Sequence, residues 1–299
     1  MKKLLIIGAS GQLGSSLMRY PKNYNVYGTF NKKSISNLIK LDITDVKNVE
    51  DVFNKIQPDI AVLSSAFVNV DECEILRQYT YNVNIEGVKN IIKQCKINKC
   101  KLVYLSTDYV FDGKNGPYRE EDKTNPVNYY GLTKLIAEEL VLSEFEDSLC
   151  IRTTGIFGWK INGTNFFMQV YRKLSSGIEI KVPIDQYGSP TLSYNLAGAV
   201  LKLIELKKKG IYNVVGTDVV SRYHFSCKIA DKMNLNSGLI KGVTTENLNQ
   251  KAPRPLKAGL IIEKFKNEVK DYNLFNITQA LDYVYKEFKN ENIKTFNNK

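Results

Sequence analysis

A short apolar run near the N-terminus ends directly in three evenly spaced glycines. Residues 4–7 are all leucine or isoleucine, and Gly8, Gly11 and Gly14 follow before the helix-forming stretch 15–19. The apolar run predicts a buried strand. Glycine permits a tight turn and a close backbone approach, and the N-terminus of the next helix offers unpaired N–H groups to a pyrophosphate. The spacing differs from the commonest G-x-G-x-x-G, and a plain strand–helix turn is the alternative. The strand–turn–helix context nevertheless favours a dinucleotide-binding turn.

Strand-like and helix-like segments then alternate along the chain. This β–α–β alternation predicts an α/β protein with a Rossmann-type doubly wound parallel sheet, in which ligands bind beyond the carboxyl ends of the strands. The polar segments 64–66 and 106–108 fall at such ends. Further strands are expected at residues 38–42, 59–65, 101–107, 148–154 and 210–215. Helices are expected at residues 46–56, 73–98, 129–145, 165–175 and 195–208.

The pattern loosens after residue 154, where loops rich in glycine, asparagine and proline flank one amphipathic helix. We interpret residues 1–157 as an NAD(P)-binding domain to which residues 192–216 return. Residues 158–191 and 217–299 then form a smaller C-terminal substrate-binding lobe. The sequence contains no internal repeat and no flexible linker, so the two parts should pack closely.

A tyrosine and a lysine lie one above the other on the helix expected at 129–145. Tyr130 and Lys134 are four positions apart, whereas the neighbouring Tyr129 has Thr133 at that distance. An ammonium beside a phenol favours the phenolate, so the pair can make the phenol a proton donor or acceptor. Tyr-x-x-x-Lys also arises by chance on exposed helices, and the pair gains weight here from the glycine turn that precedes it.

Composition narrows the class of protein. The five cysteines are odd in number and form no C-x-x-C pair, which predicts reduced thiols and no metal site. No apolar run approaches the ~20 residues of a membrane span, and the first strand begins too early to leave a signal peptide. We therefore expect a cytoplasmic location and no membrane partner.

The formal charge of +11 at pH 7 raises the question of a nucleic-acid partner. The lysines are scattered, and their one run, at 207–209, falls where an expected helix ends and cations are favoured. We therefore expect no nucleic-acid partner. An anionic cofactor and an anionic substrate would both suit a basic cleft.

Several motifs together resemble one enzyme family. The chain is similar to the extended short-chain dehydrogenase/reductase superfamily, and within it to the dTDP-4-dehydrorhamnose reductase family. The similarity extends from residue 3 to about residue 265. Its motifs are the glycine turn, Asp42-Ile43, Asn84, Leu105 to Phe111, Tyr130-x-x-x-Lys134, Asp185 to Thr191, and Arg254-Pro255 with Ala258 to Leu260 downstream.

The resemblance implies a ketone reductase that uses NAD(P)H. Tyr130 would protonate the ketone oxygen, Lys134 would hold the nicotinamide ribose and lower the pKa of the tyrosine, and Thr107 would hydrogen-bond the same oxygen. Asn84 would stabilise the region of the catalytic helix. The implied cofactor contacts are Gly8, Ser10, Gly11, Gln12, Leu13, Gly14, Asn31, Lys32, Asp42, Ile43, Ser65, Ala66, Tyr130 and Lys134. The implied substrate contacts are Val68, Thr107, Asp108, Gln186, Tyr187 and Arg254, the last of these on the nucleotide diphosphate.

The end of the second strand bears on the choice of cofactor. An acidic residue about twenty positions after the glycines would bind the ribose 2′-hydroxyl and favour NAD. Residues 29–33 contain no acid, and Lys32 and Lys33 could meet a 2′-phosphate. We therefore expect NADPH to be preferred, with NADH as the alternative.

The leading expected reaction is the reduction of dTDP-4-dehydrorhamnose to dTDP-L-rhamnose, for cell-surface polysaccharide. Gly155 stands where family members carry a tryptophan that packs on the sugar, and Trp159 arrives later. Another nucleotide or another 4-keto sugar therefore stays open. Related dehydratases carry a glutamate where this chain has Tyr109, which argues against elimination. An epimerase stays open, as does an NADP-binding regulatory subunit similar to the methionine adenosyltransferase β subunit. A homodimer also stays open.

Overall fold

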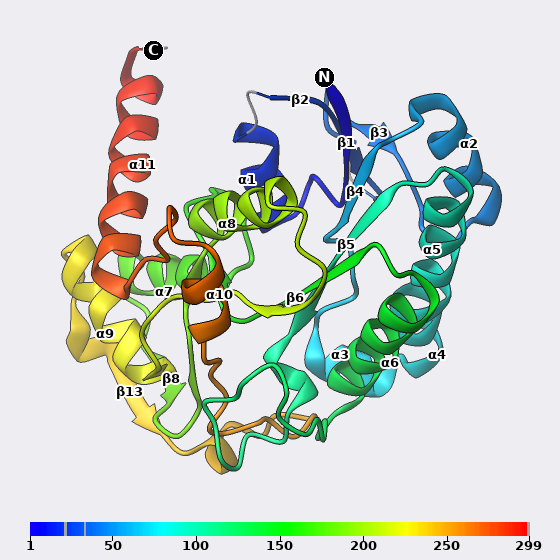
Figure 1. The fold of residues 1–299 in the computed structure, drawn as a ribbon. Helices are drawn as coiled ribbons and strands as arrows, with labels where there is room; N and C mark the ends of the chain where they lie inside the picture. The colour runs from blue at the N-terminus through cyan, green and yellow to red at the C-terminus, as the bar shows by residue number, and fades with distance from the viewer. Residues whose placement is uncertain (21–22, 33, 298–299) are drawn as a thin grey trace.

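The computed structural model describes residues 1–20, 23–32 and 34–297. Seven parallel strands form the main sheet (Figure 1). In sheet order they are β11 (Gly210–Asn213), β6 (Ser148–Thr153), β5 (Lys101–Thr107), β4 (Ile60–Leu63), β1 (Lys2–Ile7), β2 (Tyr24–Phe30) and β3 (Ile39–Lys40). The strand order reverses between β1 and β4, which is the crevice where doubly wound sheets bind ligands. The predicted α/β fold is therefore confirmed.

Helices cover both faces of this sheet (Figure 1). One face carries α1 (Gln12–Arg19) and α8 (Ser193–Glu205). The other carries α2 (Val46–Ile56), α5 (Gly87–Ile97) and α6 (Tyr129–Glu144). Leu4 and Ile6 of β1 pack in the first core and Leu5 and Ile7 in the second, because successive side chains of a strand point to opposite faces.

The long helix expected at 73–98 is broken into four pieces. They are α3 (Val70–Ile75), α4 (Arg77–Tyr81), the π-helix η1 (Asn82–Glu86) and α5. Leu76, between α3 and α4, has φ −100° and ψ 51°, outside the helical region. Helical periodicity does not show such a break, since each piece keeps its own apolar face. Short π-helical turns are often found at functional sites, and this one carries Asn84.

A third core lies beside the sheet, at the lower left of Figure 1. Its helices are α7 (Phe166–Ser175), α9 (Arg222–Met233) and α11 (Ile277–Asn297). Three small sheets pair β7 (Ile156–Phe157) with β10 (Thr191–Leu192), β8 (Ile180–Pro183) with β13 (Ile240–Val243), and β9 (Tyr187–Gly188) with β12 (Val220–Ser221). Short helical turns complete the chain: η2 (Asp108–Val110), η3 (Ser237–Leu239), η4 (Thr245–Leu248) and α10 (Glu263–Glu268).

The division into two parts stays an interpretation, and two observations bear on it. Helix α8 packs in the core of the main sheet and β11 pairs with β6. Both contacts are in keeping with residues 192–216 being part of the cofactor-binding domain. Leu260, Ile262 and Phe265 are buried in the same core, and Lys264 donates a hydrogen bond to the carbonyl of Ile211 in β11 at 2.7 Å. This segment therefore packs with the sheet, although we assigned it to the lobe.

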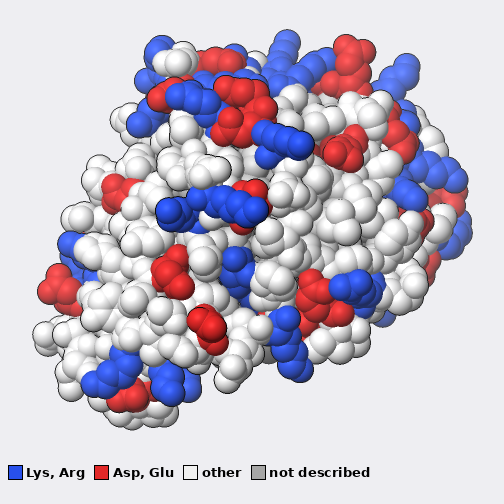
Figure 2. Space-filling model, turned by 90° about the horizontal axis from the view of Figure 1, so that it is seen from below, with Lys and Arg blue, Asp and Glu red and all other residues white. Residues whose placement is uncertain are grey.

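Charges of both signs are interspersed on the face of the molecule seen from below (Figure 2). No helix in the described part of the chain is long and apolar enough to cross a membrane. The five cysteines are free thiols. Within residues 1–20, 23–32 and 34–297, no group of three or more His, Cys, Asp or Glu side chains could hold a metal ion.

Candidate functional site

The glycine turn between β1 and α1 has the geometry of a close-approach site. Gly8 has φ +91°, and a Cβ there would lie 2.9 Å from the backbone nitrogen of Ser65. A Cβ at Gly14 would lie 2.2 Å from the carbonyl oxygen of Gly8, so a side chain at either position would push the turn apart. Helix α1 starts after Gly11 without a side-chain cap and without an acidic residue in its first turn. Its first N–H groups are thus available to an anion, and a diphosphate fits here.

The remaining residues of the turn are held by the C-terminal part of the chain. Gln12 donates a hydrogen bond to Ser193 of α8 at 3.0 Å and accepts one from Asn165 at 2.9 Å. Leu13 is buried in the first core. The carbonyl of Ser10 accepts a hydrogen bond from the ammonium of Lys160 at 2.7 Å. The turn is therefore fixed by contacts with residues more than 140 positions away.

The predicted adenosine-binding residues lie at the ends of β2 and β3. The Asp42 carboxylate accepts two hydrogen bonds from Thr44, and Ile43 is buried in the second core. Asn31 is partly buried and Lys32 exposed, and the Lys32 ammonium lies 5.4 Å from the centre of the Tyr79 ring. Lys33 lies outside the described residues.

The loop after β4 is attached to helix α6 by one asparagine. Asn84 of η1 accepts a hydrogen bond from the Phe67 amide at 2.8 Å and donates to the Phe67 carbonyl at 3.0 Å. Its amide also donates to Thr133 of α6 at 3.2 Å. The neighbouring Ser65 and Ala66 are partly buried, whereas the side chain of Val68 is 61% exposed.

Lys134 is buried in α6, and its ammonium points toward the C-terminal half of β5. Its ammonium donates to the carbonyl of Leu105 at 2.6 Å and lies 4.1 Å from the centre of the Tyr104 ring. Burial lowers the pKa of Lys134 to about 7, and the charge of Glu138 partly opposes this shift. The charged and the neutral form of this amine are therefore both populated near neutral pH.

Tyr130 lies one helical turn before Lys134 on α6 and contacts Thr107. Burial raises the pKa of Tyr130 well above its ordinary value, while a hydrogen bond with the Thr107 side chain acts in the opposite direction. This direction differs from the expected lowering by Lys134, because desolvation of the phenolate dominates. The Tyr130 ring packs edge-on against Tyr109, with centroids 5.6 Å apart.

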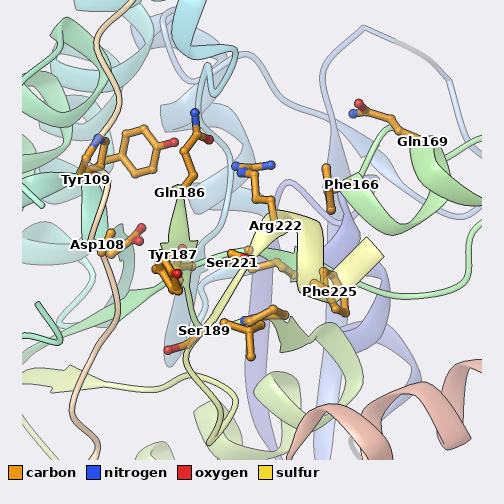
Figure 3. A pocket seen from close by; sticks show the side chains of 18 residues that line it. Asp108, Tyr109, Phe166, Gln169, Gln186, Tyr187, Ser189, Ser221, Arg222 and Phe225 are labelled. Carbon is orange, nitrogen blue, oxygen red and sulfur yellow. The ribbon is translucent and has the colours of Figure 1, made fainter. Parts of the chain in front are cut away.

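A cleft of about 300 Å³ opens next to these residues (Figure 3). The predicted substrate residues Asp108, Gln186 and Tyr187 line it, and Asp108 connects it to Thr107 by accepting a hydrogen bond at 3.1 Å. Burial raises the pKa of Asp108 to about 6, opposed by hydrogen bonds with Thr154 and Thr107. The other lining residues include Tyr109, Thr154, Gly155, Phe166, Gln169, Ser221, Arg222, Phe225, Pro255 and Ala258.

Sequence reasoning missed Arg222, the cation of this cleft. Its guanidinium lies 4.9 Å from the centre of the Phe166 ring, and it lowers the pKa of the Tyr109 phenol, which burial raises. No ion pair to it is found among the described residues. The sequence offered little signal, because Arg222 stands alone at the start of α9 rather than in a motif.

Arg254, by contrast, is engaged with the protein itself. One terminal nitrogen pairs with the Asp71 carboxylate at 3.0 Å and the other donates to the Ala252 carbonyl at 2.7 Å. The same carboxylate accepts the Ala252 amide at 2.9 Å. These contacts fasten the loop 252–254 to α3, and the predicted diphosphate contact of Arg254 stays a prediction.

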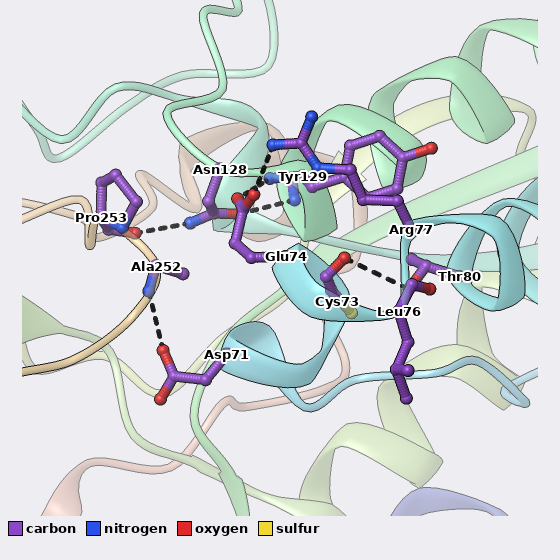
Figure 4. Close-up of polar contacts among 11 residues, drawn as sticks. Asp71, Cys73, Glu74, Leu76, Arg77, Thr80, Asn128, Tyr129, Ala252 and Pro253 are labelled. Carbon is purple, nitrogen blue, oxygen red and sulfur yellow. Dashed lines mark hydrogen bonds and ion pairs between the residues drawn. The ribbon is translucent and has the colours of Figure 1, made fainter.

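The same region anchors the start of α6 (Figure 4). Asn128 caps α6 by accepting the Gly131 amide at 2.8 Å, and it donates to the Pro253 carbonyl at 2.9 Å. The Glu74 carboxylate accepts the Tyr129 amide at 2.6 Å. Loop 252–254, α3 and the helix that carries Tyr130 are thus linked by hydrogen bonds.

Two further residues have structural rather than chemical surroundings. Trp159 contacts the rings of Tyr171 and Phe288 and donates a hydrogen bond to Glu291. Trp159 therefore belongs to the third core. Gly155 lines the cleft, and Trp159 does not take the place of the tryptophan that family members carry there. His224 is exposed on α9.

Comparisons with known proteins agree with this geometry. The family model described as "RmlD substrate binding domain" matches residues 1–290. The spore coat polysaccharide biosynthesis protein SpsK of Bacillus subtilis is 37% identical over 258 residues, which are 85% of this chain and 87% of that protein. The crystal structure of dTDP-4-dehydrorhamnose reductase from Bacillus anthracis in complex with NADP superposes with a TM-score of 0.87 at 31% identity, covering 96% of this chain and 99% of that one. The methionine adenosyltransferase 2 subunit beta of Xenopus tropicalis is 27% identical, over 89% of this chain and 82% of that protein.

Proposed function

This chain belongs to the dTDP-4-dehydrorhamnose reductase family, and we propose that it reduces the 4-keto group of a nucleotide-linked 6-deoxysugar. Membership makes it an NAD(P)H-dependent oxidoreductase of the extended short-chain dehydrogenase/reductase superfamily. The leading substrate is dTDP-4-dehydrorhamnose, with dTDP-L-rhamnose as product. The observation that carries the proposal is the contact of Tyr130 with Thr107 at the carboxyl end of β5, one helical turn from the buried Lys134. The residues that follow Thr107, Asp108 and Tyr109, line the cleft.

The proposed cofactor contacts form a continuous path across the strand ends. The turn at Gly8 and Gly14 would hold the diphosphate, and the ends of β2 and β3 the adenosine. When bound there, NAD(P)H supplies the hydride. We propose a preference for NADPH, supported by Lys32 beside the Tyr79 ring and by the absence of an acid at the end of β2. A cytoplasmic location accords with this cofactor but stays a proposal.

The phenol of Tyr130 is proposed as the proton donor. Because burial raises its pKa, the phenol is protonated at neutral pH, which suits a group that must give a proton to the developing alkoxide. Thr107 would donate a second hydrogen bond to the same oxygen. Lys134 would hold the nicotinamide ribose, and its buried ammonium would favour the phenolate that forms once the proton has left.

The substrate would occupy the cleft of Figure 3. Asp108, Gln186 and Tyr187 offer hydrogen-bonding groups for the sugar and Val68 lies at the exposed rim of the β4 loop. Arg222 is the cation among the residues that line this cleft, and we propose it as the main diphosphate contact, because the Arg254 guanidinium is already paired with Asp71. Guanidinium groups suit this because they bind phosphate with two parallel hydrogen bonds.

One assay tests the proposal against its alternatives. The protein is incubated with NADPH or NADH and a panel of dTDP-, GDP- and UDP-linked 4-keto sugars, and the absorbance of the reduced cofactor is followed. Oxidation with the dTDP-linked sugar, with a lower KM for NADPH, is expected. Isomerisation of a sugar without net oxidation would favour an epimerase. Tight NADPH binding without turnover on the whole panel would favour a regulatory subunit, the alternative supported by the methionine adenosyltransferase relative.

A further inference from the structure

Lys160 reaches from the C-terminal part of the chain back to the glycine turn. It lies in the loop between β7 and α7. Its ammonium donates hydrogen bonds to the carbonyls of Ser10 and Gly11, at 2.7 Å and 3.3 Å. These are the two residues that immediately precede the open N-terminus of α1. The motif itself supplies only neutral N–H donors, so this ammonium adds a full charge beside the turn.

The charge has no acidic partner in the described part of the chain. No carboxylate there lies within ion-pair distance of Lys160, and burial by itself lowers the pKa of this lysine. Partial burial of an ammonium without a counter-charge is unfavourable. Two of its three N–H donors are used by carbonyls and one remains. An anion bound at the turn would supply the missing counter-charge.

We propose that Lys160 binds the diphosphate of the cofactor. The C-terminal part of the chain, assigned to the substrate, then contributes a charge to the cofactor site. This inference rests on the proposed function only in so far as a nicotinamide dinucleotide binds at the turn. The diphosphate is common to NADPH and NADH, so both should depend on Lys160 equally.

Other contacts hold the Lys160 loop in place. Asn165 donates to Gln12 at 2.9 Å and to the Gly158 carbonyl at 3.1 Å, and Gln12 donates to Ser193. Removal of the ammonium should therefore leave the loop beside the turn. A purely structural lysine and a cofactor-binding lysine can thus be separated by experiment.

The test measures cofactor binding without any sugar. Dissociation constants for NADPH and NADH are obtained from cofactor fluorescence with the intact chain, for wild type, Lys160→Met, Lys160→Arg and Lys173→Met, an exposed lysine of α7. Lys160→Met should weaken both cofactors about 10-fold, the size of one lost charge-assisted hydrogen bond. Its affinity should also depend less on salt than that of wild type. Lys160→Arg should recover most of the loss, and Lys173→Met should show none.

Four outcomes would overturn the inference. Unchanged affinities in Lys160→Met would leave the lysine with a structural role alone. Weaker binding of NADPH only would move its contact to the 2′-phosphate. Weaker binding together with a lower melting temperature of the cofactor-free protein, not recovered by arginine, would indicate a disturbed loop. If wild type binds neither cofactor, the proposed function fails as well. Tight cofactor binding without sugar turnover would refute the proposed reductase activity but not the proposed contact of Lys160 with the diphosphate.

Discussion

The cofactor half and the substrate half of the site are built in different ways. The cofactor half consists largely of contiguous motifs, such as the turn at 8–14 and the Tyr130–Lys134 pair, each at the end of one strand or on one helix. The substrate half draws single residues from η2, α7, β9, α9 and the loop at 252–258. A local pattern can be recognised without the fold, whereas a cleft made of isolated residues cannot.

The two arginines illustrate this difference. Arg254 lies within a recognisable family motif, yet its guanidinium is used by Asp71 and Ala252. Arg222 lies in no motif, yet it lines the cleft beside Phe166. A motif therefore locates an arginine along the chain, and its neighbours in space decide what its charge can reach.

The largest expected effect is at the junction of the two halves. Tyr130→Phe removes the proposed proton donor and should lower kcat by ~10²-fold or more. The dissociation constant for NADPH, measured by cofactor fluorescence, should stay largely unchanged, because the ring still packs against Tyr109. Tyr129→Phe removes the adjacent phenol oxygen and serves as the control. Near-normal turnover in Tyr130→Phe would remove the tyrosine from the mechanism.

A smaller effect is expected from the arginines of the substrate half. Arg222→Met should raise the KM for the sugar nucleotide about 10-fold, because one charge-assisted contact to the diphosphate is lost. Cofactor affinity should not change. Arg254→Met should instead lower the melting temperature by a few degrees, since Asp71 loses its partner and the loop 252–254 its anchor. Steady-state kinetics and thermal unfolding of both variants provide the check.

The reverse pattern would contradict this assignment. A large KM effect in Arg254→Met with none in Arg222→Met would return the diphosphate contact to Arg254. The two halves would then both be predictable from motifs, and the contrast between them would disappear.

The last expected effect concerns the pH dependence of stability in the cofactor half. Burial lowers the pKa of Lys134 to about 7, whereas an unfolded lysine titrates near ~10.4. Between these values the unfolded chain holds a proton that the folded chain has lost, so the free energy of unfolding should rise with pH. Lys134→Met should reduce the slope by up to ~1.4 kcal/mol per pH unit in this range. Denaturant unfolding from pH 7 to 10 measures this slope, and Lys173→Met serves as the control. Equal slopes in wild type and Lys134→Met would contradict the lowered pKa of Lys134.

Much of the fold was predictable because its signals are local. The expected strand at 101–107 and the helix at 46–56 match β5 and α2 at both ends. The helix expected at 73–98 was wrong as one element, because Leu76 leaves the helical region and Asn84 is turned toward Phe67. Those features depend on contacts with the β4 loop, which periodicity does not contain.

The sequence by itself determined the parallel sheet, the glycine turn and the alignment of Tyr130 with Lys134. These follow from the alternation of strand residues, from the conformations open only to glycine, and from the 3.6-residue helical repeat. The tertiary structure decided that burial raises the pKa of Tyr130, that Arg222 faces the cleft, and that Lys160 meets the glycine turn. The physical reason is that desolvation and charge pairing depend on which segments pack together, and no short-range pattern specifies that packing.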